Sequence, residues 1–253
     1  MPEGPVRVAI VGDDEAHRIL AEHLADEVSA GVSELASRRR FVGDGKRARF
    51  YKIGARPPKP RGPGGRPQYR AQRSAGAPAG YAAVLVEAVR EVVAEADVVL
   101  VLADEDGEGD RMNAPGRCGA LLGDLRRRVV VGVCNPVAEA WFIAFVADTH
   151  PDRAAQLDRQ AGRPASRRPH LLCSRPSTAL HHAKRALRFL RGDAETLSAC
   201  SAVTLHADEL EALLVNHSAP LGSLRELGEC GLGGFIEALE TTYVPRLLAP
   251  GPG

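Results

Sequence analysis

The chain has 253 residues, of which 44% are hydrophobic and 4% aromatic, and its formal net charge is +1. This length allows one large domain or one domain with an appendage, and the hydrophobic content is enough for a core of Val, Leu and Ala. No apolar run approaches the roughly 20 residues of a membrane span, and no leader-like segment precedes the first strand pattern, so we expect a cytoplasmic protein without a membrane partner.

The first predicted element is a buried strand over residues 6–11, followed by a turn at residues 12–14. Asp13 or Asp14 can cap a helix that runs to about Val28, with apolar side chains at helical spacing. A strand, an acidic turn and a helix in this order are typical of the beginning of a βαβ unit.

Residues 29–80 differ sharply in composition from the rest of the chain. Between Arg38 and Arg73 there are 13 Lys or Arg residues and one acidic residue, whereas the remainder carries 20 basic and 31 acidic residues. The prolines and glycines of residues 57–67 exclude a helix or a central strand, so we expect an inserted basic loop. Its charge favours binding to nucleic acid, with a solvated loop that has no partner as the alternative. The candidate nucleic-acid-binding residues are Arg38, Arg39, Arg40, Lys46, Arg47 and Lys52.

After a predicted helix that begins at Tyr81, an apolar strand over residues 98–103 stops abruptly at acidic residues and glycines. A strand of this kind is buried on both faces of a parallel sheet and presents its terminal carboxylates at the edge where ligands bind. On an extended segment Asp104 and Asp106 point to the same side, so both can reach one ion. Carboxylate ligands suit Mg²⁺ or Mn²⁺.

The remaining pattern predicts a helix over residues 118–127, a third strand over 128–134 and a helix over 137–147 that carries Glu139 in its first turn. Residues 149–169 are expected to form a polar connection without regular structure. Further helices are expected at residues 179–191, 194–200, 207–215 and 234–239. We therefore expect an α/β fold, with a parallel sheet flanked by helices in a domain of residues 1–148 and a mostly helical C-terminal appendage over residues 149–253.

Three segments in this order resemble the Toprim (topoisomerase–primase) fold: residues 8–15 (VAIVGDDE), 102–107 (LADEDG) and 135–144 (NPVAEAWFIA). The last is similar to the Glu-Ala-Trp segment of small bacterial Toprim-like proteins, which include relatives of the overcoming-lysogenisation-defect nucleases and RloB-like proteins. The resemblance implies a metal-dependent phosphodiesterase or nuclease, in a phage-defence or mobile-element setting. It implies that Asp104 and Asp106 hold Mg²⁺ or Mn²⁺, and that Asp13, Asp14, Glu15 and Glu139 are the candidate catalytic acids.

The chain departs from the family pattern at one position, because Val11 stands where the family has the glutamate that acts as general acid or base. Either an acid among residues 13–15 replaces that glutamate, or the site binds metal without efficient cleavage. The alternative function is therefore a catalytically degenerate Toprim-like regulator or adaptor that binds nucleic acid or a partner protein, such as an ATPase.

Histidines and cysteines do not form a recognisable metal motif. His17 lies near the acidic turn and is expected at the surface of the first helix, with an assisting role beside the acids of that turn as the alternative. The five cysteines are widely spaced and lack a Cys-x-x-Cys pair, so we expect reduced, buried thiols and no zinc site. Trp141, the one tryptophan, is expected to pack against the sheet.

Overall fold

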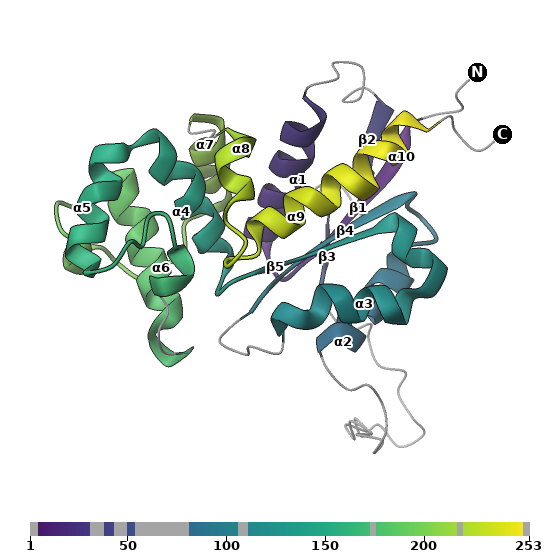
Figure 1. Ribbon diagram of the computed structural model, residues 1–253, viewed down its shortest axis with the longest axis horizontal. Coiled ribbons are helices and arrows are strands. Elements are labelled where there is room, and N and C mark those ends of the chain that lie inside the picture. The colour runs from purple at the N-terminus through teal and green to yellow at the C-terminus, as the bar shows by residue number, and fades with distance from the viewer. Residues whose placement is uncertain are drawn as a thin grey trace, which may run out of the picture.

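The computed structural model describes residues 5–30, 38–42, 50–53, 81–105, 111–172, 176–216 and 220–249. Its centre is a parallel sheet in the order β2-β1-β4-β5, in which β3 also pairs with β1 (Figure 1). The strands are β1 (Val6–Gly12), β2 (Arg39–Val42), β3 (Phe50–Lys52), β4 (Val98–Asp104) and β5 (Val129–Cys134). β2 pairs with residues 6–9 of β1 and β3 with residues 10–12, so the two short strands follow each other along one edge of β1.

The alternation of side chains along the central strands builds two hydrophobic cores. Val8, Ile10 and Leu100 face one core, whereas Ala9, Val11 and Val99 face the other. The second core is covered by α2 (Tyr81–Val92) and α3 (Ala114–Leu122). The first core is covered by α1 (Glu15–Ser29), α4 (Ala138–Thr149) and the last helices of the chain. This two-sided covering explains the continuous apolar runs of β1 and β4.

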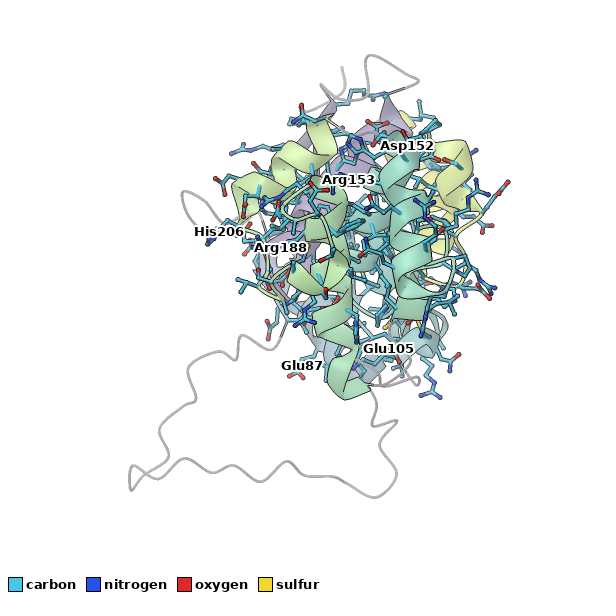
Figure 2. The ribbon with its side chains drawn as sticks, turned by 90° about the vertical axis from the view of Figure 1, so that its left-hand side faces the viewer. Glu87, Glu105, Asp152, Arg153, Arg188 and His206 are labelled. Atoms are coloured by element: carbon cyan, nitrogen blue, oxygen red, sulfur yellow. The ribbon has the colours of Figure 1, made fainter. Side chains whose placement is uncertain are left out.

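A group of helices extends the first core beyond the end of the sheet. It comprises α5 (Pro151–Ala161), α6 (Pro176–Arg191), α7 (Ala207–Asn216) and α8 (Leu221–Arg225). Arg153 of α5 donates to the carbonyls of Phe189 and Ala194, and Arg188 of α6 donates to the carbonyl of Val203 (Figure 2). These bonds hold the connections between the helices in place.

The last part of the chain returns to the sheet. It forms α9 (Leu232–Ala238), a π-helical turn (Leu239–Tyr243) and α10 (Val244–Leu248). The ring of Phe235 packs directly on Gly132 of β5, where an added Cβ would lie 2.5 Å from the ring. The C-terminal segment therefore contributes to the core of the sheet as well as to the helical end.

The predicted α/β class, with a parallel sheet, flanking helices and a mostly helical C-terminal region, is confirmed. The structure differs in four places. Two strands, β2 and β3, lie inside the range expected to be a loop, and α5 lies inside the stretch expected to be a polar connection. The helix expected at 194–200 is only a 3-10 turn at Leu197–Ala199, and α3 ends at Leu122 before a 3-10 segment, Gly123–Arg128. Within the described residues, no helix is long and apolar enough to cross a membrane.

Candidate functional site

The carboxyl ends of β1, β4 and β5 bring several polar side chains together. Asp13 and Asp14 follow β1, Asp104 ends β4 and Cys134 ends β5. Of the two residues predicted as possible caps, Asp14 is the N-cap of α1. Its Oδ1 accepts hydrogen bonds from the backbone N–H groups of Ala16 and His17. The cap places the first turn of α1, and with it His17, over the end of β4.

His17 is the centre of this cluster, and the expectation of a surface histidine is wrong. Its side chain is fully buried, with Nδ1 2.8 Å from Asp14 Oδ1 and Nε2 3.0 Å from Asp104 Oδ1. Burial lowers the pKa of His17, but the charge of Asp104 and the hydrogen bonds to Asp104, Asp14 and Cys134 outweigh it, so the pKa lies well above its ordinary value. With both ring nitrogens donating to carboxylates, the ring is an imidazolium.

Asp104 links the ends of three elements. Its Oδ1 accepts a hydrogen bond from the backbone N–H of Ala138, the first residue of α4, at 2.8 Å, in addition to the bond from His17. Its own N–H donates to Asp13 Oδ2 at 3.2 Å, and its carbonyl accepts from Arg111 at 3.0 Å. Asp104 therefore holds α1, α4 and the loop after β1 together at the end of the sheet.

Tyr81 and Arg111 close the other side of the cluster. The Tyr81 hydroxyl donates to Asp13 Oδ2 at 3.2 Å, and the guanidinium of Arg111 lies 4.2 Å from the centre of the Tyr81 ring. Burial raises the pKa of Tyr81, and the charge of Asp13 raises it further, so the hydroxyl stays a donor. Asp13 thus acts as an acceptor for two groups of the protein.

Glu139 lies in the first turn of α4 and is buried. Burial raises its pKa to about 7; Lys184, whose Nζ lies 3.8 Å from Oε1, opposes this shift and Asp104 adds to it. A carboxyl group that titrates near neutral pH is suited to proton transfer. This property supports Glu139 as a candidate acid or base.

The other predicted residues are placed less centrally. Glu15 is exposed and pairs with Arg18. Because Arg18 also contacts Glu22 and Glu211, Glu15 belongs to a surface ion-pair network. Asp106 lies outside the described residues, and its expected partnership with Asp104 stays a prediction. Glu105 is buried, and its N–H donates to the carbonyls of Cys134 and Pro136.

Two of the three basic residues at 38–40 have side chains that form contacts within the protein. Arg39 pairs with Asp26 and donates to Ser29, and Arg38 donates to the carbonyl of Ala249 at 3.4 Å. Arg40 is exposed. Lys46 and Arg47 lie outside the described residues, as does the side chain of Lys52.

One group of potential metal ligands occurs among the described residues. His17, Asp104 and Cys134 each offer one ligand atom, and these atoms lie within 4.8 Å of one another. The sequence contains no motif for this group, because the three residues come from α1, β4 and β5. The available signals were the Asp14-x-x-His17 spacing and a cysteine at the end of a buried strand.

The group formed by His17, Asp104 and Cys134 does not fit Mg²⁺, which prefers carboxylate, carbonyl and water oxygens. Asp104 Oδ1 already accepts two hydrogen bonds from the protein, and the other two ligand atoms of the group belong to an imidazole and a thiol. Val11, which stands where the resembled family pattern has a glutamate, is fully buried in the core. This group can hold a metal ion, but its imidazole and thiol do not indicate magnesium.

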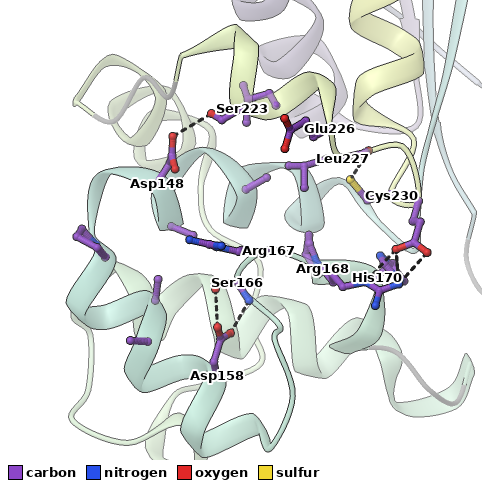
Figure 3. A pocket seen from close by; sticks show the side chains of 18 residues that line it. Asp148, Asp158, Ser166, Arg167, Arg168, His170, Ser223, Glu226, Leu227 and Cys230 are labelled. Carbon is purple, nitrogen blue, oxygen red and sulfur yellow. Dashed lines mark hydrogen bonds and ion pairs between the residues drawn. The ribbon is translucent and has the colours of Figure 1, made fainter.

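A separate hollow of about 730 Å³ lies between α4, α5, α8 and the segment before α6 (Figure 3). Its polar groups are largely paired with each other: Arg168 forms a fork with Glu229, and Asp158 accepts two bonds from Ser166. Among the described residues, no acid at the end of β1 or β4 lines it. We therefore place the candidate site at the edge of the sheet and not in this hollow.

No protein-family model, curated protein or solved structure matches the chain.

Proposed function

We propose that this chain is a Toprim-like domain that binds nucleic acid and has lost Mg²⁺-dependent phosphodiester cleavage. The observation that carries the proposal is the arrangement of Asp104, whose Oδ1 accepts hydrogen bonds from His17 Nε2 and the Ala138 N–H. In the family that the sequence resembles, the corresponding carboxylate is a metal ligand. Here its Oδ1 accepts two hydrogen bonds that fix two helices to the sheet, an arrangement that does not favour Mg²⁺.

The charge at this edge supports the same view. Crowded carboxylates repel each other unless a cation lies between them, and the buried His17 imidazolium lies between Asp14 and Asp104. An imidazolium offsets one of the two negative charges, but it cannot coordinate a phosphoryl oxygen or generate a metal-bound hydroxide. Val11 adds no proton-transfer group from β1.

Binding to nucleic acid is supported by the separation of charge along the sequence. The basic residues gather between Arg38 and Arg73, whereas the rest of the chain is net acidic. Lys and Arg that contact phosphates release counterions, so binding of this kind weakens steeply with salt.

The binding test uses fluorescence anisotropy with labelled single-stranded and duplex DNA and RNA over a series of salt concentrations. Because residues 39–42 and 50–52 belong to the sheet, the test variant leaves them intact and changes to Gln only the basic residues Arg56, Lys59, Arg61, Arg66, Arg70 and Arg73. We expect weaker binding and a flatter salt dependence, with the slope falling by up to about 0.9 for each lost duplex phosphate contact.

A control variant carries the same charge change on exposed positions elsewhere: Arg90, Arg126, Arg127, Arg159, Arg167 and Arg246 changed to Gln. It should keep most of the affinity and the slope. Equal losses in the two variants would show that only net charge matters and would remove the proposed role of the basic segment. Absence of binding by the unchanged chain at low salt would contradict the proposal.

The cleavage test incubates the same substrates with the full chain and either Mg²⁺ or Mn²⁺. We expect no cleavage above that of Asp104→Asn. Cleavage that requires Asp104 would contradict the loss of activity.

Glu139 favours a second candidate function, a phosphodiesterase. It is a buried carboxyl with a pKa raised to about 7 by burial, and a lysine lies 3.8 Å away. If the chain cleaves nucleic acid, Glu139→Gln should lower the rate by about 10²–10⁴-fold, the usual contribution of a general acid or base. An unchanged rate would remove Glu139 from the reaction.

A further inference from the structure

Three ligand atoms of different chemistry meet at the ends of separate elements. His17 comes from the first turn of α1, Asp104 from the end of β4 and Cys134 from the end of β5, and their ligand atoms lie within 4.8 Å of one another. His17 and Cys134 are fully buried, whereas the side chain of Asp104 is partly exposed. The cluster thus reaches the protein surface on the Asp104 side.

Asp14 orients the imidazole of His17 within this cluster. Its Oδ1 lies 2.8 Å from His17 Nδ1, which fixes the ring and directs Nε2 toward Asp104. Histidines that bind metals commonly donate their other ring N–H to a carboxylate, which orients the ring and raises its basicity. Asp14 has this position with respect to His17.

We propose that His17, Asp104 and Cys134 form a binding site for a divalent transition-metal ion such as Zn²⁺, with Asp14 as the positioning residue of the imidazole. Zinc binds imidazole, carboxylate and thiolate ligands at about 2.0–2.3 Å, and such ligands around one ion are separated by about 3.3–3.8 Å. The observed 3.0 Å between Nε2 and Asp104 Oδ1 has to widen by a few tenths of an ångström, and the separations that involve Cys134 Sγ, which are at most 4.8 Å, have to shorten by up to about 1 Å to reach this range. Three protein ligands leave one position of a tetrahedral site for water or another ligand.

Binding exchanges protons for the ion. The Nε2 proton of the imidazolium and the proton of the Cys134 thiol leave, and the ion takes their place between the imidazole, the carboxylate and the thiolate. The ion then supplies the positive charge that the imidazolium provides without it. This site goes beyond the proposed function, because it does not require that nucleic acid binds.

The test titrates the full-length protein, freed of metal with a chelator, with Co²⁺, which reports thiolate ligation through an intense charge-transfer absorption. We expect one ion per chain, a charge-transfer band, and displacement of Co²⁺ by Zn²⁺ but not by an excess of Mg²⁺. Cys134→Ser should abolish the band, and Asp14→Asn should lower the affinity by about 10–100-fold, the usual effect of losing the partner of a metal-bound histidine.

Cys118→Ser is the matched control. Cys118 is also fully buried, but it belongs to the core on the opposite face of the sheet and hydrogen-bonds the carbonyl of Ala82. This variant should keep the band. No band in the wild type, a band that persists in Cys134→Ser, or displacement of Co²⁺ by Mg²⁺ would overturn the proposal. If Cys134→Ser does not fold, the affinity of Asp14→Asn decides, because Asn can still cap α1.

Discussion

His17 changes the charge of the acidic cluster at the end of the sheet. Two carboxylates contact its two ring nitrogens at 2.8 and 3.0 Å, so the side chain adds a positive charge where the sequence alone shows only acids. The effect depends on the position of His17 three residues after the N-cap, which points its ring back toward the end of the sheet. A difference of one residue in this spacing would turn the ring away from Asp104.

Glu139 provides a prediction about pH at the scale of a single residue. Burial raises its pKa to about 7, whereas in the unfolded chain a glutamate titrates near its ordinary value of 4.5. Below that value both states are protonated; between it and pH 7 only the unfolded state ionises, so the free energy of unfolding falls as pH rises and levels off above 7. At 1.36 kcal/mol per pKa unit the full loss is about 3 kcal/mol.

Glu139→Gln removes this loss, because the amide does not ionise. The variant should match the wild type near pH 4 and exceed it in unfolding free energy by up to about 3 kcal/mol at pH 8, measured by urea denaturation at each pH. Glu87→Gln, on the exposed face of α2, is the control and should change little at either pH (Figure 2). A constant difference between Glu139→Gln and wild type across this range would contradict the assigned titration.

At the scale of elements, the junction of β1 and α1 depends on a glycine. A Cβ added to Gly12 would lie 2.7 Å from the Cβ of His17, which is fixed to the helix backbone and cannot rotate away. Gly12→Ala therefore has to displace the start of α1 and lengthen the contacts of His17. We expect a loss of about 1–3 kcal/mol in the free energy of unfolding, as for other overpacked sites, measured by urea denaturation.

Gly119→Ala is the control for this prediction. Gly119 lies inside α3 with no atom within 4 Å of an added Cβ, and alanine in a helix interior is more favourable than glycine by about 0.5–1 kcal/mol. The two variants should therefore change stability in opposite directions. A Gly12→Ala protein as stable as the wild type would show that α1 adjusts without strain.

For the molecule as a whole, the sequence was sufficient for the elements that bury continuous apolar runs. β1, β4, β5 and α1 lie close to their predicted bounds, because strand and helix periodicity are strong there. The edge strands β2 and β3 were not predicted, since β-pairing with β1 organises segments whose basic composition resembles a loop. The convergence of Asp13, Asp14 and Asp104 followed from a parallel sheet, but the contributions of His17 and Cys134 depend on tertiary packing that no local pattern encodes.

The helix α4 crosses the domain boundary expected at residue 148. Every residue from Ala138 to Ala147 of α4 is buried, which requires cover on all sides of the helix. The sheet and α1 provide part of this cover, whereas α6 and α7 contact α4 from the segment after residue 149, and Phe235 of α9 packs against Trp141. A chain of residues 1–148 would remove the cover of Trp141 by Phe235 and of α4 by α6 and α7, and burial of one large aromatic side chain contributes about 1.5–3 kcal/mol.

We therefore expect that residues 1–148 alone do not fold cooperatively. The measurement is thermal and urea unfolding followed by circular dichroism, together with the binding of a dye that reports exposed apolar surface. A chain that ends at residue 249 keeps every described helix and should unfold as the full chain does. A sharp unfolding transition of residues 1–148, without dye binding, would show that the α/β part is an independent domain and that the helices after it are an appendage in the strict sense.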